Sequence, residues 1–258
     1  MCIFKINYIG RSNNNLLQVI SAINYCLDNN IYKIIVPNHQ LFELNTNIIV
    51  KNGCKCNKIF NKIPINNTYI DNNITLCEYK KLSNKYIKHK FLNTNIYQDM
   101  IYDIGIHIRS GDTFDKNPHS FYIPLPLSYY KKILSCNINK NIIIVYEDDK
   151  NPVINLLINE YRHYKNIYFQ SSTLINDIIS LSNCKNLYIS IGTFFYIPYI
   201  ISKTIQEVFI PSLIKGKTKF GNLKGKNINI IELSNYINLG EWKNTIYQTN
   251  LILNYKLQ

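Results

Sequence analysis

Apolar and polar positions in the second half of the chain fall into blocks whose lengths separate strands from helices. Runs of strand length occupy residues 104–108, 141–146, 167–169, 187–191 and 208–210. Longer stretches with helical spacing lie between them, at residues 127–134, 152–161, 174–182 and 194–202. Because strands alternating with helices of this length are joined by right-handed crossovers, the pattern predicts a parallel sheet. Residues 102–214 are therefore expected to form one Rossmann-like domain.

The first 36 residues show the same order of elements. Cys2–Tyr8 predicts a strand, Asn15–Leu27 an amphipathic helix and Ile31–Val36 a second strand closed by Pro37. This β-loop-α-β order is half of a doubly wound unit. Residues 40–100 alternate polar runs with short apolar pieces and predict an irregular or partly helical segment. The chain is thus expected to be α/β, with an N-terminal α/β domain at 1–101, the Rossmann-like domain at 102–214 and closing helices at 215–258.

Composition changes this picture little. Hydrophobic residues make up 46% and charged residues 17% of the 258, which is typical of a globular protein. The net charge of +13 favours an anionic ligand such as a nucleotide sugar. The lysines are scattered singly, without an arginine-rich block or an aromatic RNA-binding signature, so nucleic-acid binding is not expected. The excess of Asn, Ile and Lys suggests an A- and T-rich genome, such as that of a large DNA virus or a similar microbe.

Cysteine usage and hydropathy predict a soluble cytoplasmic protein. The seven cysteines have no regular spacing, which favours free thiols and a reducing compartment. No charged region followed by a small-residue cleavage site opens the chain. The most apolar window, Leu187–Ile201, is interrupted by polar residues, Gly and Pro, and is too short to span a bilayer of about 30 Å.

Candidate chemistry begins where the strand at 104–108 ends, with Arg109-Ser110-Gly111-Asp112. In open α/β sheets ligands bind outside the carboxyl ends of the strands. The guanidinium of Arg109 offers a fork of donors suited to two phosphate oxygens, and Gly111 permits close approach to the backbone.

Three more strand ends are expected at the same edge. The segment 147–149 carries three carboxylates, the segment 171–173 carries three hydroxyls before a helix that includes Asp177, and the segment 190–195 carries Gly192, Thr193 and Phe194. Hydroxyls and backbone N–H groups at a helix N-terminus form an anion site, so Thr193 and Phe194 are expected to face the same anion as Arg109.

The stretch from His107 to Asp112 resembles the His-x-Arg-Arg-x-Asp signature of α1,2- and α1,6-fucosyltransferases (family 11-like) and protein O-fucosyltransferases. Ser110 stands where many members carry a second Arg. The segment 147–149 resembles the family's Ser-Asp-Asp, and 190–195 resembles its Ser-Thr-Phe-Ser. The matches keep the family's order from 104 to about 213, and Gly10, Asn14 and Gln18 fit its N-terminal turn.

The resemblance implies a GT-B-like fold with an abbreviated N-terminal half, and inverting, metal-independent transfer of fucose from GDP-fucose to a hydroxyl of a glycan or glycoprotein. It places Arg109 on the pyrophosphate, His107 beside the nucleotide, and Asp177 on the base or ribose. The full set of expected donor-binding residues is His107, Arg109, Ser172, Asp177, Gly192, Thr193, Phe194, Gly10 and Asn14. No metal ion and no resident cofactor are expected, since Asp148-Asp149, the nearest approach to a metal motif, fits a turn better.

A general base must reach the proton of the acceptor hydroxyl, so the candidates are Asp112, Asp115 and His119, all in the loop after Arg109.

Several alternatives stay open. Asp112 can instead cap its own turn or pair with Arg109, and His107 can be an ordinary core residue. Ser110 leaves room for another deoxysugar donor, such as that of a rhamnosyltransferase. A non-catalytic nucleotide- or glycan-binding protein is the alternative outside enzymes. The sequence assigns no oligomeric state.

Overall fold

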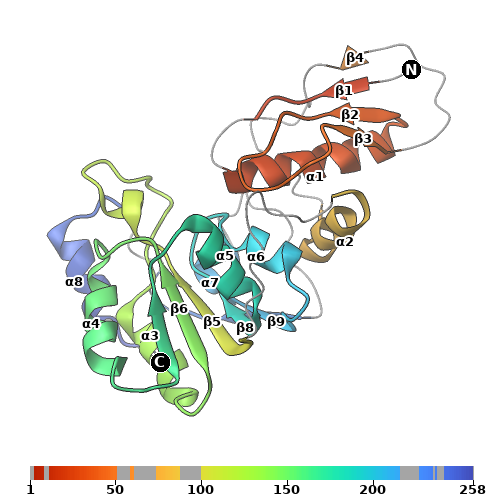
Figure 1. The fold of residues 1–258 in the computed structure, drawn as a ribbon. Helices are drawn as coiled ribbons and strands as arrows, with labels where there is room; N and C mark the ends of the chain where they lie inside the picture. Colours follow the sequence, from red (N-terminus) through yellow and green to blue (C-terminus); the bar gives the residue numbers. More distant parts are fainter. Residues whose placement is uncertain are drawn as a thin grey trace. The chain divides into compact units, whose positions relative to one another are not determined.

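The structure is a computed structural model in which residues 3–8, 12–50, 59–60, 74–87, 100–215, 227–234, 236 and 241–257 are described. The chain divides into two compact units (Figure 1). The first comprises Met1–Ile96, Tyr199–Ile201 and Lys219–Lys226, and the second comprises Tyr97–Pro198, Ser202–Thr218 and Asn227–Gln258. Each unit is built on its own sheet.

The first unit contains a four-stranded sheet in the order β3-β2-β1-β4. Its strands are β1 (Ile3–Lys5), β2 (Lys33–Ile35), β3 (Asn47–Ile49) and β4 (Ile59–Phe60). Strand β1 is parallel to β2 and β4, whereas β3 runs antiparallel to β2. Helix α1 (Ser12–Asp28) buries an apolar face that includes Leu16, Val19 and Ile20, as its helical spacing predicts.

Helix α2 (Leu76–Tyr86) begins at a capping box in the stretch whose sequence predicts partly helical structure. The Thr75 hydroxyl accepts a hydrogen bond from the backbone N–H of Glu78 at 3.2 Å, and the Glu78 carboxylate accepts from the N–H of Thr75 at 2.7 Å. Two otherwise unpaired backbone donors are satisfied in this way, which fixes the start of the helix.

The second unit contains a six-stranded sheet in the order β10-β9-β8-β5-β6-β7, and all of its pairings are parallel. Its strands are β5 (Tyr102–Ile108), β6 (Ile142–Tyr146), β7 (Ile167–Gln170), β8 (Cys184–Tyr188), β9 (Glu207–Pro211) and β10 (Ile228–Ile231). The chain runs outward from β5 to β7, returns to β8 on the other side of β5, and runs outward again to β10. This is the doubly wound order, and the strand order reverses between β5 and β8.

Helices cover both faces of this sheet (Figure 1). In chain order they are η1 (a 3₁₀ helix, Gly111–Phe114), α3 (Leu127–Cys136), α4 (Pro152–Tyr161), α5 (Leu174–Ser182), α6 (Tyr196–Ile201), α7 (Ser212–Lys215) and α8 (Ile246–Asn254). Among the described residues, no helix is long and apolar enough to cross a membrane.

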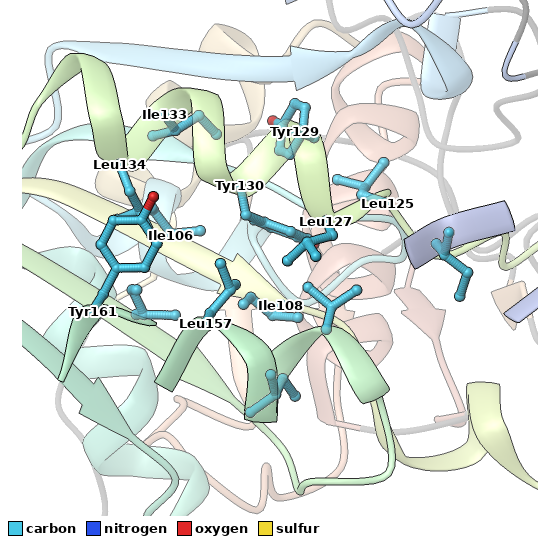
Figure 2. Close-up of a cluster of buried hydrophobic side chains, with 14 of the residues drawn as sticks. Ile106, Ile108, Leu125, Leu127, Tyr129, Tyr130, Ile133, Leu134, Leu157 and Tyr161 are labelled. Carbon is cyan, nitrogen blue, oxygen red and sulfur yellow. The ribbon is translucent and has the colours of Figure 1, made fainter. Parts of the chain in front are cut away.

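A hydrophobic core cluster lies between one face of the sheet and helices α3, α4 and α8. Ile106 and Ile108 of β5 pack there against Tyr130 of α3 and Leu157 of α4 (Figure 2). On the opposite face, a Cβ added to Gly105 would lie 2.8 Å from the Sγ of Cys184, so glycine allows β8 to pack closely against β5. Strand β5 is therefore buried on both faces, and its position at the centre of the sheet is fixed.

The predicted α/β fold is confirmed, with a parallel sheet of six strands flanked by helices, whereas the sheet of the first unit is mixed because β3 runs antiparallel to β2. Several predicted boundaries are wrong, including that of the strand predicted at Cys2–Tyr8, which is Ile3–Lys5, and two beside the carboxyl edge of the second sheet. The strand predicted at 187–191 is Cys184–Tyr188, because the apolar residues Ile189 and Ile191 continue past the strand into a buried loop. The helix predicted at 194–202 is Tyr196–Ile201. The C-terminal segment, predicted to supply closing helices, contains α8 and also strand β10, which extends the sheet.

Candidate functional site

The candidate site lies at the carboxyl edge of the six-stranded sheet, where the loops after β5 and β8 diverge. In doubly wound folds, ligands bind in the crevice formed at this reversal of strand order. The loop after β5 carries Arg109, and the loop after β8 carries Gly192–Phe194. The sequence-based placement of both segments at strand ends is confirmed.

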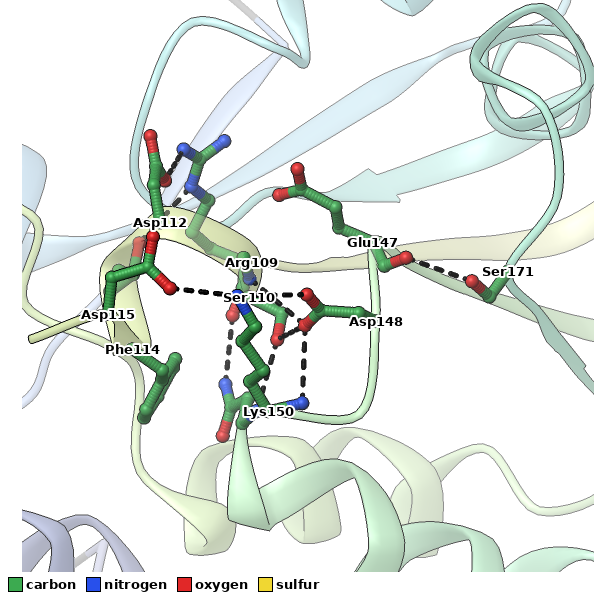
Figure 3. A network of polar contacts seen from close by, with 12 residues as sticks. Arg109, Ser110, Asp112, Phe114, Asp115, Glu147, Asp148, Lys150 and Ser171 are labelled. Carbon is green, nitrogen blue, oxygen red and sulfur yellow. Dashed lines mark hydrogen bonds and ion pairs between the residues drawn. The ribbon is translucent and has the colours of Figure 1, made fainter.

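The turn after β5 is held by one carboxylate from the turn after β6 (Figure 3). Asp148 Oδ1 accepts hydrogen bonds from the Ser110 hydroxyl, from the N–H of Gly111 at 3.1 Å and from the N–H of Lys150 at 3.2 Å. Burial raises the pKa of Asp148, but the bonds from Ser110, Gly111 and Lys150 outweigh it, so that the net pKa lies below the ordinary value. Asp148 is thus a turn-forming residue, as the sequence predicts.

Ser110 is fully buried and connects the two turns. Its hydroxyl also accepts a hydrogen bond from the N–H of Asn151 at 3.0 Å. The Asn151 amide in turn donates to the carbonyl of Arg109 at 2.9 Å, while its Oδ1 caps helix α4 at the N–H of Val153. The backbone that carries Arg109 is therefore fixed by hydrogen bonds from the β6–α4 connection.

The guanidinium of Arg109 is oriented by three contacts. Nη2 forms an ion pair with the Asp112 carboxylate, Nε donates to the Thr113 hydroxyl at 3.3 Å, and Cζ lies 5.5 Å from the centre of the Tyr122 ring. The Arg109 side chain is 15% exposed. An arginine held in this way loses little side-chain freedom when it binds an anion.

The candidate bases lie in the loop that follows. The His119 ring stacks on Tyr122 at 4.6 Å between ring centres, so that His119 and Arg109 contact the same aromatic ring. His119 Nδ1 accepts from the N–H of Phe121 at 3.3 Å. Asp115 instead forms an ion pair with Lys150 at 2.8 Å. Each of the three candidate bases therefore already has a partner.

His107 joins the ends of β5 and β8. Its Nδ1 lies 2.8 Å from the Ser190 hydroxyl, and its ring lies 4.6 Å from that of Phe194. Burial, and secondarily the charge of Arg109, lower the pKa of His107 to about 3, so the imidazole is neutral near pH 7. His107 fixes the β8 loop at the edge and carries no charge there.

The β8 loop is open at Gly192, which has a φ of 99° and no atom within 4 Å of an added Cβ. The helix predicted to begin at Phe194 begins instead at Tyr196, because Thr193 and Phe194 form a turn in which the Thr193 carbonyl accepts from the N–H of Tyr196 at 3.2 Å. Phe194 packs on His107, so its ring is part of the wall of the site.

Asp177 and Ser172 lie at the far side of the same edge, after β7. The buried Asp177 carboxylate accepts from the side-chain amide of Gln170 at 2.8 Å, and burial raises the pKa of Asp177 despite the bonds from Gln170 and Ser172. Strands β7 and β8 are separated by β6 and β5, a distance of about 14 Å at the usual strand spacing. Ser172 and Asp177 are therefore not brought together with Gly192–Phe194.

Two of the expected donor-binding residues, Gly10 and Asn14, belong to the first unit and stay predictions. Asn14 lies in the first turn of α1 and is partly buried. Gly10 lies outside the described residues. Within the described residues, no group of three or more His, Cys, Asp or Glu side chains is arranged to hold a metal ion.

Sequence reasoning missed Tyr122, which contacts Arg109 from 13 residues further along the chain. It placed Ser190 at this edge within the segment 190–195 but did not predict the bond of Ser190 to His107 across 83 residues. Neither contact has a local sequence signal. Trp242 lies in the segment 215–258, which was predicted to supply closing helices; its indole N–H donates to the carbonyl of Thr113 at 2.7 Å and thereby holds the loop after Arg109.

Fold and site together define the class: a doubly wound α/β protein with an arginine fixed at the carboxyl edge of its central strand. No protein-family model matches the chain, and neither does any curated protein. Solved structures that match it include E. coli ADP-heptose LPS heptosyltransferase II, with 10% identity, 58% of this chain and 45% of that chain covered, and a TM-score of 0.37.

The E. coli heptosyltransferase WaaC also matches. Its structure with ADP-2-deoxy-2-fluoro heptose has 10% identity, covers 68% of this chain and 52% of that chain, and has a TM-score of 0.39. Its structure with ADP has 9% identity, covers 60% and 49%, and has a TM-score of 0.34. The chain thus spans about half the length of the solved structures that it matches.

Proposed function

We propose that this protein is a nucleotide-sugar-dependent glycosyltransferase that binds the diphosphate of its donor at Arg109. The observation that supports this most directly is the position of that guanidinium. It lies at the carboxyl end of the central strand, beside the reversal of strand order, and is oriented by Asp112, Thr113 and Tyr122. The resemblance of residues 107–112 to the fucosyltransferase signature makes GDP-fucose the proposed donor.

The reaction is an inverting transfer without a metal ion. The bond between the anomeric carbon and the diphosphate oxygen breaks, and its electron pair leaves with the diphosphate, whose charge Arg109 neutralises. The acceptor hydroxyl forms the new C–O bond on the opposite face of the sugar ring and gives its proton to a base.

The base is one of the two carboxylates, Asp112 or Asp115. Because His119 Nδ1 accepts a backbone hydrogen bond, the neutral ring carries its proton on Nε2 and has no lone pair there for the acceptor proton. The carboxylates of Asp112 and Asp115 are paired with Arg109 and Lys150, respectively, and each keeps acceptor capacity beyond its ion pair.

Calorimetric titration with GDP, ADP, UDP and dTDP tests the donor site. Arg109→Ala is expected to weaken binding about 100-fold or more, because a charged group within the site loses its partner. Arg162→Ala is the matched control, since this substitution removes the same charge from an exposed position at the C-terminal end of α4. Binding of none of the four nucleotides would overturn the proposal. Preference for UDP or dTDP would retain the transferase and exclude fucose as proposed.

A non-catalytic nucleotide-binding protein is the second candidate. It is favoured by one observation, namely that every candidate base already has a hydrogen-bond or ion-pair partner. Incubation of the protein with GDP-fucose and a panel of glycan acceptors distinguishes the two. GDP release that depends on an acceptor, and that falls in Asp112→Asn or Asp115→Asn, supports the transferase. Tight GDP binding without transfer supports the binding protein.

A further inference from the structure

The carboxylate of Glu147 has a position that the proposed reaction does not use. Glu147 is the first residue after β6 and is exposed. Its backbone carbonyl accepts from the Ser171 hydroxyl at 3.0 Å, whereas its carboxylate makes no hydrogen bond or ion pair within the described part of the chain. An ionised acceptor with unused capacity therefore stands at the edge where the ligand is proposed to bind.

This carboxylate lies directly against the turn that follows β5. A Cβ added to Gly111 would lie 2.3 Å from Glu147 Oε2 and 2.5 Å from its Cδ, so the glycine lets the carboxylate lie against the turn in this position. Gly111 also has a φ of 60°, a backbone conformation that residues other than glycine rarely adopt. Figure 3 shows Glu147 and Arg109 extending from neighbouring strand ends on the side of the edge away from the Asp148 network.

The sheet topology relates the positions of Gly111 and Glu147 to those of known nucleotide-binding residues. In the order β7-β6-β5-β8-β9-β10, β5 is the first and β6 the second strand of a doubly wound sheet. In dinucleotide-binding folds with this order, the glycine turn after the first strand approaches the pyrophosphate, and an acidic residue further along hydrogen-bonds the ribose hydroxyls. Here Gly111 and Glu147 occupy the ends of these two strands and are in contact.

The opposite charges of Arg109 and Glu147 indicate which part of a ligand each residue would bind. A carboxylate repels phosphate and accepts hydrogen bonds from hydroxyls, whereas the guanidinium of Arg109 binds oxyanions. A ligand with an anionic group and vicinal hydroxyls fits both residues, and a nucleoside diphosphate has this composition.

We propose that Glu147 accepts hydrogen bonds from the vicinal ribose hydroxyls of the nucleotide whose diphosphate binds Arg109. This inference rests on the proposed function and adds the residue that selects a ribonucleotide. Asp149, two positions further on, is exposed and carries the same charge, but the three atoms nearest to a Cβ added at Gly111 all belong to Glu147.

The test compares a ribonucleotide, its dideoxy analogue and pyrophosphate. Wild type is titrated with GDP, ADP and UDP, and the one that binds most tightly is then compared with its 2′,3′-dideoxy form. Wild type is expected to bind the dideoxy form about 10- to 100-fold more weakly, which corresponds to the loss of hydrogen bonds to a charged acceptor.

Two substitutions and one control assign that loss. Glu147→Gln keeps one acceptor oxygen and Glu147→Met keeps none, so ribonucleotide affinity should fall from wild type to Gln to Met. The dideoxy nucleotide should bind these variants at least as tightly as wild type, because it lacks the hydroxyls and the variants lack a charge that repels phosphate. Pyrophosphate should bind the variants at least as tightly as wild type, because a negative charge is removed. Asp149→Asn should change none of these affinities by more than about twofold.

The outcomes separate the two proposals. A wild type that binds none of the three nucleotides overturns the nucleotide site and this inference with it. A wild type that binds the ribonucleotide and its dideoxy form equally retains the nucleotide site and overturns the role of Glu147. Tighter binding of every anion to Glu147→Met, without discrimination between the two nucleotides, also overturns it, since Glu147 would then act only as a repelling charge.

Discussion

Replacing Asp148 with Ala removes the carboxylate that accepts three hydrogen bonds at the turn after β5. Its Oδ1 accepts from the Ser110 hydroxyl, the Gly111 N–H and the Lys150 N–H. Hydrogen bonds to a charged group contribute about 1.5–3 kcal/mol each, so three of them set an upper limit of about 9 kcal/mol. Bonds that share one acceptor are not additive, and water reaches the Asp148 side chain, which is 33% exposed.

The largest part of the expected loss in unfolding free energy comes from the Ser110 hydroxyl. Ser110 is 0% exposed, so water does not replace its lost acceptor as readily as it does for the backbone of Lys150. We therefore expect Asp148→Ala to lower the free energy of unfolding by about 2–4 kcal/mol. Asp148→Asn keeps the acceptor oxygen and is expected to cost about 1 kcal/mol.

Urea unfolding followed by fluorescence measures the change, because Trp242 is the only tryptophan in the chain and is 1% exposed. Asp149→Ala is the matched control and is expected to fall within about 0.5 kcal/mol of wild type. Equal unfolding midpoints for the Asp148 and Asp149 variants would refute the assignment of the turn to Asp148.

The pH dependence gives a second readout. Since the pKa of Asp148 is lowered in the folded state, its ionised form stabilises the fold above the ordinary Asp range, near pH 4. This contribution is lost as the pH falls through the folded-state pKa. The difference in stability between wild type and Asp148→Asn should therefore shrink below about pH 4. A difference that grows on acidification would contradict the direction of the shift.

Three further predictions follow from neighbouring contacts. The pKa of His107 is lowered to about 3, below that of the unfolded chain, so the stability due to this neutral ring is complete above about pH 6.5 and is lost as the pH falls toward 3. Urea unfolding across this pH range should therefore give a smaller slope of unfolding free energy against pH in His107→Gln than in wild type. Gly111→Ala should cost about 1–2 kcal/mol from its positive φ, measured by thermal unfolding, with a loss of nucleotide affinity as Glu147 is displaced. Trp242→Phe removes the donor to the Thr113 carbonyl and should cost about 1–3 kcal/mol, with faster hydrogen exchange in the loop after Arg109.

The predictable parts of the molecule are those encoded locally. Buried parallel strands are continuous apolar runs, so residues 104–108 and 142–146 can be recognised as strands from sequence alone. The residues that follow these two strands must lie at one edge of the sheet. This is why the position of Arg109 follows from sequence. The end of β8 does not, because Ile189 and Ile191 are buried outside the sheet and extend the apolar run past the strand.

The contacts that orient the site are long-range and therefore have no local signal. Ser190 meets His107 only because β8 returns to the side of β5 opposite β6, and Trp242 reaches Thr113 from the C-terminal segment. Tyr122 and Trp242 are both aromatic residues whose positions are decided by the path of a loop. In a chain with 21 tyrosines, composition does not single out the one beside Arg109.

In the resemblance of residues 107–112 to the fucosyltransferase signature, Ser110 is the position that differs, and its surroundings give a physical reason for the difference. The side chain is fully buried, and its hydroxyl bonds to Asp148 and to the N–H of Asn151. An arginine with this backbone conformation would place its charge in the buried network and leave both partners without the hydroxyl. The turn of this chain is therefore built for a small hydroxyl residue, and the end of β5 offers one permanent cation where many members of that family have two. For this reason the effect of Arg109→Ala on nucleotide affinity should not be offset by a neighbouring arginine.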